Sequence, residues 1–277
     1  MDSLKLKVIS TDYCFRVDTI GEHGLTVLIE NDYGKILFDT GQGFGIRHNP
    51  KILGWDLSNL DAIAISHGHN DHIGGLNEVL KICKSGKVTV CGHKDIFANR
   101  VKIYPWGEGP TGPPNTQEEY EDAGAKFVFN DVPLELVKGV SLTGPIERTF
   151  AETNTTAHFQ VIDGKKVPDP FHDDQALIVE TGKGLVIVFG CAHAGVINTM
   201  NHVERLTGDK TFYGLFGGTH LLEANDDVLK TTLKEIERRE VKLLGFNHCT
   251  GLSSLAFFHR NFSGHSCDAS TGFSAEI

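Results

Sequence analysis

The first ninety residues alternate between short apolar runs and glycine-containing turns, a pattern typical of β-strands. LKLKVIST at 4–11 alternates apolar and polar positions, whereas LDAIAIS at 60–66 is a nearly continuous apolar run, as in a buried strand. Residues 73–86 have apolar positions at helical spacing and end on Gly86, which predicts a helix. We expect the strands of this half at 4–11, 24–31, 34–41, 60–66 and 87–93.

The second half of the chain repeats this order of strands, polar strand ends and helices. Helices are expected over 196–207 and 225–240, and Asn225 is suited to cap the second one. Two similar halves predict an α/β fold, a four-layer αββα sandwich with two mixed β-sheets face to face and helices outside. We expect the strands of this half at 125–130, 139–146, 174–182, 184–191, 210–218 and 241–251, the last leading into a short helix.

The sequence predicts a single domain over 1–277 with one interruption. Residues 104–119, YPWGEGPTGPPNTQEE, are rich in Pro and Gly and predict a long loop, which would be an insertion or a lid. Trp106 in this loop could cover the cleft and stack on a flat heterocycle. A wholly structural, exposed loop is the alternative.

Composition and charge limit the classes of partner that the protein could bind. The chain has 277 residues, of which 40% are hydrophobic, and a formal charge of −10 with His neutral. This acidity argues against nucleic-acid partners, because phosphate backbones need a basic surface. Six dispersed cysteines without a C-x-x-C pair indicate reduced thiols. With no leader-like N-terminus and no bilayer-length apolar run, we expect a cytoplasmic protein without a membrane partner, and the sequence leaves its oligomeric state open.

The stretch ISHGHNDHIGGL, residues 65–76, concentrates the candidate chemistry. His67 and His69 are two apart in an extended loop, so their side chains point the same way and can bind one metal ion. Asp71 and His72 follow at the start of a helix and suit a second ion. Imidazole and carboxylate are zinc ligands, and iron and manganese accept the same set.

Three later strands also end in histidine, at His193, His220 and His248. Each of these residues alone is as often an ordinary turn residue as a ligand. If the strand ends lie along one edge of the sandwich, however, they converge with the first cluster. Together the histidines predict a single metal site.

The motifs around these histidines resemble those of a known family. SHGHNDHIGG resembles the signature of the metallo-β-lactamase-fold hydrolases, and ILFDTG resembles an earlier strand of that superfamily. GEHGLTVLIE, LTGPIER, GCAHAG, GGTHLL and GFNHCTG resemble one branch, the 7,8-dihydropterin-6-yl-methyl-4-(β-D-ribofuranosyl)aminobenzene 5′-phosphate synthase-like proteins, over nearly the whole chain. The resemblance implies the αββα fold, and it places Asp39 under the metals, where it holds a ligand in position.

The resemblance also implies a ligand set, with one departure from the superfamily. Most members have a Gly-Asp whose carboxylate bridges the two ions, whereas this chain has Gly190-Cys191 followed by His193. Either the Cys191 thiolate or His193 could take that place, or the bridge could be absent. We expect His193 to bind, because imidazole needs no deprotonation near neutral pH, with Cys191 as a buried neighbour. The expected ligands are His67, His69 and His193 for the first ion, and Asp71, His72 and His248 for the second.

Other polar residues are candidates for substrate binding or reserve ligands. His23 and His220 could project over the site, and Thr250 opens a helix whose free N–H groups suit an anion. Arg148 is a weaker anion candidate. The reserve ligands, for which strand-start capping is the alternative, are His172, Asp173 and Asp174.

The sequence therefore predicts one or two divalent ions, zinc before iron or manganese. Such ions activate water, so we expect a metal-dependent hydrolase or transferase acting on a small anionic ester or phosphate, pterin-like as the branch name implies. Asp71 could hold or accept the proton of that water. The alternative is an iron-binding redox or sensor protein on the same scaffold. Diiron oxidoreductases of this fold generally have a Glu where His69 stands, which favours the hydrolytic interpretation.

Overall fold

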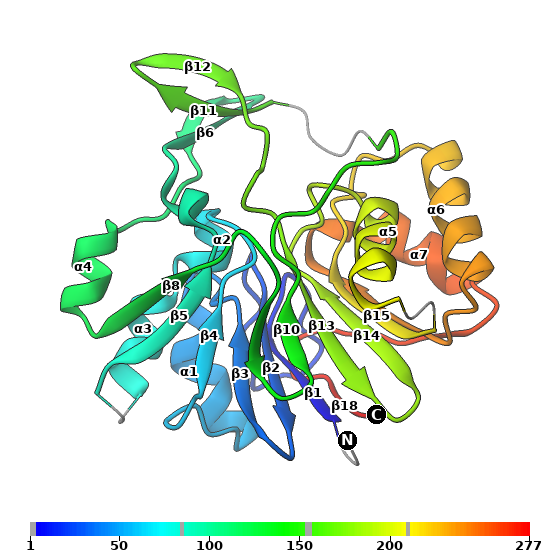
Figure 1. Cartoon of the computed structure of the whole chain (residues 1–277), viewed down its shortest axis with the longest axis horizontal. Helices are drawn as coiled ribbons and strands as arrows, with labels where there is room; N and C mark the ends of the chain where they lie inside the picture. The colour runs from blue at the N-terminus through cyan, green and yellow to red at the C-terminus, as the bar shows by residue number, and fades with distance from the viewer. Residues whose placement is uncertain (1–3, 84–85, 153–156, 209–210) are drawn as a thin grey trace.

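Two seven-stranded β-sheets packed face to face form the centre of the molecule (Figure 1). The computed structural model describes residues 4–83, 86–152, 157–208 and 211–277. In spatial order, the first sheet contains β18 (Ser274–Glu276), β1 (Leu4–Ser10), β2 (Thr26–Asn31), β3 (Gly34–Phe38), β4 (Ala62–Ala64), β5 (Val88–Gly92) and β8 (Ala125–Phe129). The second contains β17 (His265–Ser266), β16 (Leu243–Asn247), β15 (Phe212–Gly218), β14 (Gly184–Phe189), β13 (Ala176–Thr181), β10 (Val140–Leu142) and β9 (Leu134–Val137).

The space between the sheets is filled by side chains at alternate strand positions. Leu6 and Val8 of β1 share one buried cluster with Leu177 of β13 and Val186 and Val188 of β14. Because successive side chains of a strand point to opposite faces, each strand gives its other face to a helical layer. The apolar residues of each strand therefore contribute to two hydrophobic cores, one between the two sheets and one between a sheet and its helices.

Helices cover both outer faces of the sandwich. The first sheet packs against α1 (Phe44–Leu53), α2 (Asn70–Ile73), α3 (Leu76–Ile82) and α4 (Gln117–Asp122) through a second buried cluster. The second sheet packs against α5 (Val196–Thr207), α6 (Asp226–Arg238) and α7 (Leu252–Asn261) through a third. The predicted αββα sandwich is confirmed, and α6 begins at the expected cap, because the Asn225 side chain accepts hydrogen bonds from the N–H groups of Asp227 and Val228.

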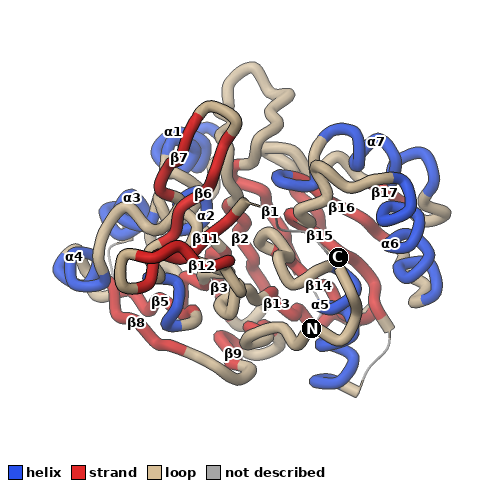
Figure 2. Tube along the Cα trace, turned by 90° about the horizontal axis from the view of Figure 1, so that it is seen from above, coloured by secondary structure: helices blue, strands red, loops and turns tan. Residues whose placement is uncertain are grey.

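A third, four-stranded sheet projects from the sandwich and corrects the prediction for residues 104–119. Its strands lie in the order β12 (Lys165–Pro168), β11 (His158–Ile162), β6 (Arg100–Tyr104) and β7 (Gly107–Pro110). The Pro/Gly-rich stretch thus begins in a hairpin, and it ends in α4, capped by the Thr116 side chain. The loop prediction was wrong there because Pro and Gly also occupy hairpin turns and edge strands. We call these four strands the insertion sheet; they stand above α2 in Figure 1, and in Figure 2, where the molecule is seen from above, they lie on the viewer's side of it.

Several elements differ from the predictions. The expected helix over 73–86 is two helices, α2 and α3, interrupted at Gly74–Gly75, because glycine is a poor helix former; residues 84–85 lie outside the described residues. The expected strand 139–146 is only Val140–Leu142, since Gly144 and Pro145 end the ladder. Helix α1 was not predicted, because the glycines before it indicated only a turn. Residue 210, the expected start of β15, lies outside the described residues.

The carboxyl ends of the parallel strands meet along one edge of the sandwich. Strands β3, β4 and β5 are parallel to one another, as are β14, β15 and β16. The loops that follow these strands therefore project from the same edge, below the insertion sheet (Figure 1). All six cysteines are free, and within the described part of the chain no helix combines the length and hydropathy needed to cross a bilayer.

Candidate metal centre

The predicted strand-end residues converge on this edge of the sandwich. His67, His69 and Asp71 follow β4, His193 follows β14 and His248 follows β16. Two triads of potential metal ligands form there: His67, His69 and His193, and Asp71, His72 and His248, with the ligand atoms of each triad within 4.8 Å of one another. These are the two groups that the sequence analysis assigned to two ions.

The first triad is centred on the Nε2 atom of His67. This nitrogen lies 3.0 Å from Nδ1 of His69 and 3.2 Å from Nε2 of His193. All three side chains are buried, and the ring of Phe171 stacks on His193 with 4.0 Å between centroids. The surrounding structure thus restricts all three imidazoles to one orientation.

The second triad is centred on the Nε2 atom of His248. It lies 3.2 Å from Nε2 of His72 and 3.5 Å from Oδ2 of Asp71. Asp71 Oδ2 is 3.9 Å from Nε2 of His72. Burial raises the pKa of the Asp71 carboxyl, but the neighbouring histidines, His72 and His248 first among them, together lower it by more, so that it lies below its ordinary value. Asp71 is therefore a carboxylate at neutral pH.

Cys191 connects the two triads. Its Sγ lies 3.1 Å from Nε2 of His72, and it forms a further potential ligand group with His67 and His72. The thiol of Cys249 is 3.3 Å from Sγ of Cys191. Burial raises the pKa of the Cys191 thiol well above its ordinary value, and only a nearby cation would offset that effect. The structure therefore places both Cys191 and His193 where they could bind an ion, and the two alternatives are not exclusive.

Asp39 lies beneath both triads, as the resemblance implied. Its carboxylate accepts hydrogen bonds from the Ser66 N–H and the Ser66 hydroxyl, both at 2.7 Å, and from Nδ1 of His72 at 2.7 Å. The Ser66 hydroxyl also accepts from Nδ1 of His67 at 2.9 Å. A side chain at Gly190 would lie 2.0 Å from the Ser66 hydroxyl, so glycine is required where β14 passes this network.

Asp12 fixes the second triad from its outer side, and the sequence analysis did not find it. Its Oδ2 accepts from Nδ1 of His248 at 2.5 Å, and its Oδ1 lies 2.6 Å from Nδ1 of His23. These hydrogen bonds hold the pKa of Asp12 below its ordinary value although burial opposes them, and Asp12 raises that of His23 to about 9. His23 reaches the site edge, where its Nε2 is 3.3 Å from Oδ2 of Asp71. Asp12 is a single aspartate after β1 with no ligand motif around it, so the sequence did not indicate a role at the metal centre.

Hydrogen bonds orient three of the imidazoles so that ring nitrogens face one another. His72 donates through Nδ1 to Asp39, and His248 donates through Nδ1 to Asp12, so their Nε2 atoms face each other at 3.2 Å. Burial lowers the pKa of His72, but the carboxylates of Asp39 and Asp71 raise it by more, so that it lies above its ordinary value. In the same way, His67 directs Nε2 at His69 and His193, and burial lowers the pKa of these three rings well below the ordinary value. Closely gathered ring nitrogens beside a carboxylate, with His69 Nε2 and His193 Nδ1 buried and unpartnered among the described residues, are a donor set that fits bound metal ions.

The backbone at the strand ends is strained. Five of the non-glycine residues with positive φ adjoin the site: Asp39, Phe171, Ala192, His220 and His248, with φ between 48° and 56°. Side chains other than glycine seldom adopt this conformation, which is concentrated at functional sites. The strain turns the chain sharply at the edge and directs the ligands inward.

The reserve ligands hold the backbone of the ligand loops. Asp173 accepts a hydrogen bond from the Gly68 N–H at 2.8 Å, and Asp174 accepts one from the Ala194 N–H at 2.7 Å. His172 is exposed. The alternative interpretation of these residues as capping groups therefore fits the two aspartates. Burial raises the pKa of Asp174 to about 7.

The predicted substrate contacts have different environments. His220 lies beside the first triad, with 4.6 Å between its ring centroid and that of His193. Thr250 is fully buried and its hydroxyl accepts a hydrogen bond from Thr219, whereas anion binding by the N–H groups at the helix start stays a prediction. Arg148 donates to the Pro170 carbonyl, and Trp106 is 83% exposed at the tip of the insertion sheet, where it stacks on Tyr104.

Sequence reasoning missed two residues that lie against the centre from the insertion sheet. Arg100 is 1% exposed; it donates to Asp169 at 2.7 Å and to Asp173 at 2.6 Å, which links the insertion sheet to the loop of His67 and His69. His158 stacks on His69 with 5.1 Å between centroids. Arg100 and His158 lie in two separate segments, and neither segment contains a recognisable motif, so the sequence did not indicate their role.

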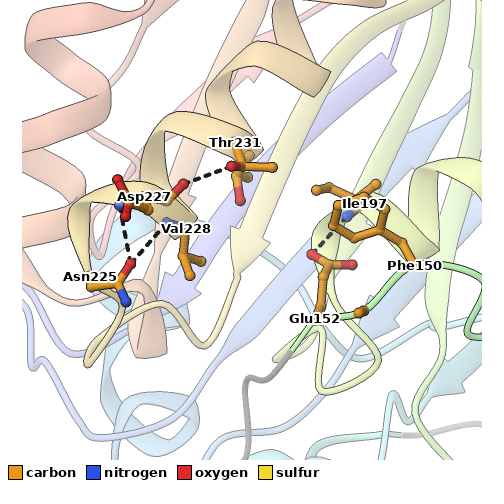
Figure 3. A pocket seen from close by; sticks show the side chains of 9 residues that line it. Phe150, Glu152, Ile197, Asn225, Asp227, Val228 and Thr231 are labelled. Atoms are coloured by element: carbon orange, nitrogen blue, oxygen red, sulfur yellow. Dashed lines mark hydrogen bonds between the residues drawn. The ribbon is translucent and has the colours of Figure 1, made fainter.

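A separate pocket lies between α5 and α6, away from the histidines (Figure 3). Its lining includes Glu152, whose carboxylate accepts hydrogen bonds from the N–H groups of Ile197 and Asn198 at the start of α5. Burial raises the pKa of Glu152. This carboxylate caps a helix and belongs to none of the potential metal-ligand groups found among the described residues.

Fold and site together define a class of protein, an αββα sandwich with potential metal ligands, mostly His and Asp, at the ends of its strands. Comparison with known families agrees with this class. The sequence profile of the metallo-beta-lactamase superfamily matches residues 20–196, which is more than half of the chain. The protein belongs to the metallo-β-lactamase superfamily.

Relatives and solved structures place the chain within that superfamily. It is 29% identical over 273 residues to the 7,8-dihydropterin-6-methyl-4-(beta-D-ribofuranosyl)-aminobenzene-5'-phosphate synthase of Methanocaldococcus jannaschii, covering 95% of this chain and 92% of the relative. An uncharacterized protein of the same organism is 32% identical over 237 residues, covering 84% and 86%. The crystal structure of Tm1679, a metal-dependent hydrolase of the beta-lactamase superfamily, matches with a TM-score of 0.85 and 28% identity over 99% of both chains. The resemblance stated from the sequence, including its branch, is confirmed.

Proposed function

We propose that the protein is a metal-dependent hydrolase or transferase that acts on a small anionic ester or phosphate substrate. The observation that carries this proposal is the pair of adjacent ligand triads, with imidazole nitrogens of neighbouring rings 3.0–3.2 Å apart. His67, His69 and His193 would hold one divalent ion, and Asp71, His72 and His248 a second. Zinc fits this nitrogen and carboxylate set, as do iron and manganese. Bound ions would supply an activated water and a Lewis acid for an electrophilic oxygen.

The residues around the ligands prepare the site for that chemistry. Asp39 and Asp12 accept the Nδ1–H groups of His72 and His248, so that both Nε2 lone pairs stay free for ligation. Asp71 remains ionised and could hold or accept a proton at Oδ2. His23 lies at the open edge, 66% exposed and hydrogen bonded to Asp12, where its Nε2 could donate to a substrate oxygen. These roles leave no side chain as a covalent nucleophile.

The substrate class draws on the relatives. The name of the M. jannaschii enzyme describes a compound in which a dihydropterin is linked to a ribofuranosyl-aminobenzene 5′-phosphate. The similarity of this chain to that enzyme supports a flat heterocyclic, phosphorylated substrate here. At 29% identity the relative's reaction does not transfer by itself, because one fold hosts many reactions. The exact substrate is therefore part of the test.

Elemental analysis tests the metal centre. Purified protein should contain one to two equivalents of zinc, iron or manganese, and a His67→Ala/His69→Ala variant should lose most of it because the first triad keeps only His193. His259→Ala, at an exposed histidine of α7, is the matched control and should retain the metal. Equal metal content in the double variant and the control would refute the site.

A substrate panel tests the reaction. Phosphomonoesters, phosphodiesters, lactones and thioesters should include at least one substrate whose kcat/KM falls about 100-fold or more in His72→Ala, because that change removes a ligand outright. Circular dichroism should show that the variant is folded. Strong visible absorbance from bound iron, with no turnover of any panel member, would favour the redox or sensor function instead.

A further inference from the structure

An unpartnered buried histidine lies beside the first triad. His158 of β11 is 9% exposed, and neither Nδ1 nor Nε2 has a hydrogen-bond partner among the described residues. Its ring stacks on His69 and lies 5.9 Å from both His193 and His220, measured between centroids. A buried imidazole without partners costs free energy, so such a residue is expected to have a ligand.

Lys102 of β6 stands directly opposite His158. The two residues are paired in the antiparallel register of β6 and β11, so their side chains lie on the same face, about 5 Å apart at Cβ. No carboxylate of the described residues lies within ion-pair distance of Lys102, whereas Lys166 on the neighbouring β12 is paired with Glu108. The His158 ring in turn lies 5.9 Å from that of His220, between centroids, so Lys102 stands beside a pair of neighbouring imidazoles.

The same face of β6 is directed at the metal centre. Alternate residues of a strand share a face, so Arg100, Lys102 and Tyr104 point the same way. Arg100 reaches Asp173, which holds the Gly68 N–H between the ligands His67 and His69. A side chain at Gly68 would lie 1.9 Å from the Ile96 carbonyl, just before β6, and 2.6 Å from Nη1 of Arg100 in β6, so the ligand loop is in tight contact with the start of the insertion sheet. Lys102 is the next residue on this face, so the anchoring of Arg100 also fixes its position relative to the metal ligands.

We propose that Lys102, His158 and His220 form an anion subsite for a phosphomonoester group of the substrate, supplied by the insertion sheet and adjacent to the metal centre. This inference rests on the proposed function, because it assigns a second contact to the substrate of that site. Lysine contributes a point charge and the imidazoles contribute neutral N–H donors, a combination suited to the several oxygens of a phosphate. Tyr104, whose ring lies 5.5 Å from the Lys102 ammonium, borders the subsite.

Binding of phenyl phosphate to the metal-loaded protein, measured by titration calorimetry, tests the subsite. Lys102→Met should weaken binding about tenfold or more, because a charged hydrogen bond is lost, and Lys102→Arg should restore most of it. His158→Phe, which keeps a ring against His69 but removes both nitrogens, should also weaken binding about tenfold. Lys165→Met removes the same charge from an exposed position of the insertion sheet and should change the affinity less than twofold. Metal content should be unchanged in all four variants.

Several results would overturn the subsite. They are wild-type affinity in Lys102→Met, equal weakening in Lys165→Met, loss of metal in His158→Phe, equally tight binding of benzoate, and no binding of phenyl phosphate at millimolar concentration. The two proposals fail separately. A metal-free wild type, or one without turnover, contradicts the proposed function, whereas unchanged affinity in Lys102→Met contradicts the subsite and leaves metal-dependent turnover intact.

Discussion

At the residue scale, short hydrogen-bonded chains orient three of the imidazoles, those of His67, His72 and His248, for ligation. Asp39 orients His72 directly and His67 through Ser66, and Asp12 orients His248. Such partners are as necessary as the ligands themselves, because they fix the tautomer that presents a lone pair. Only Asp39 among these was recognised from the sequence, since it follows a strand in a familiar motif. Asp12 lies far from the histidine motif in sequence and meets His248 only in the folded chain.

A second question at the residue scale is whether Cys191, His193 or both bind the metal. If both bind, Cys191→Ala and His193→Ala should each lower metal affinity about tenfold or more, because each removes one first contact with an ion. Cys191→Asp should keep most of the affinity by restoring the carboxylate found in most of the superfamily. Competition with a chromophoric chelator measures these affinities. Wild-type affinity in Cys191→Ala would show that the thiol is only a neighbour, and Cys267→Ala, a free thiol outside the potential ligand groups, is the control.

At the element scale, the insertion sheet was the least predictable part. The insertion sheet has short strands rich in Gly and Pro, and its buried anchor Arg100 pairs with Asp169 and Asp173, which are far away in sequence. Helix α6, in contrast, was predicted with its cap, because Asn225 and the apolar spacing after it are local signals.

The pairing of α5 and α6 gives a pH-dependent prediction. Arg239 at the end of α6 donates to Glu235 at 2.8 Å and to Glu204 of α5 at 3.0 Å. Burial raises the pKa of Glu235, but the hydrogen bonds from Arg239 and Arg238 lower it by more. A lowered folded-state pKa means that this carboxylate stabilises the fold above its unfolded-state pKa of about 4.3 and that the contribution is lost on acidification.

Glu235→Gln should therefore lower the free energy of unfolding by about 1 kcal/mol at pH 7 and by much less at pH 3. Urea denaturation at both pH values measures the difference. Glu223→Gln, at an exposed residue without an ion pair among the described residues, should have little effect at either pH. An equal loss for Glu235→Gln at pH 3 and pH 7 would show that the charge is not responsible.

At the scale of the whole molecule, the metal centre joins the two sheets. His67, His69, Asp71 and His72 follow strand β4 of the first sheet, whereas His193 and His248 follow strands of the second. A bound ion would therefore link both halves of the sandwich, and a ligand that binds only the folded state stabilises that state.

Removal of metal by a chelator should lower the Tm of the protein by about 5 °C or more, a shift of the order expected for a tightly bound ligand. The His67→Ala/His69→Ala variant should start from the lower Tm and respond little to the chelator. Differential scanning calorimetry checks both values, with His259→Ala expected to behave as the wild type. A Tm that does not depend on metal in the wild type would contradict the linkage of the sheets.

The sequence by itself determined the layers and most of the candidate ligands. Hydrophobic periodicity is local, so strands, helices and their order could be read from it, and a dense cluster such as His67 to His72 signals metal binding wherever it folds. Only the tertiary structure decided which distant residues complete the site. Asp12, Arg100 and His158 carry no local signal, and Thr250 turns inward to Thr219. The physical reason is that a contact between residues far apart in sequence depends on how strand ends and the insertion sheet are packed, which no short stretch of sequence encodes.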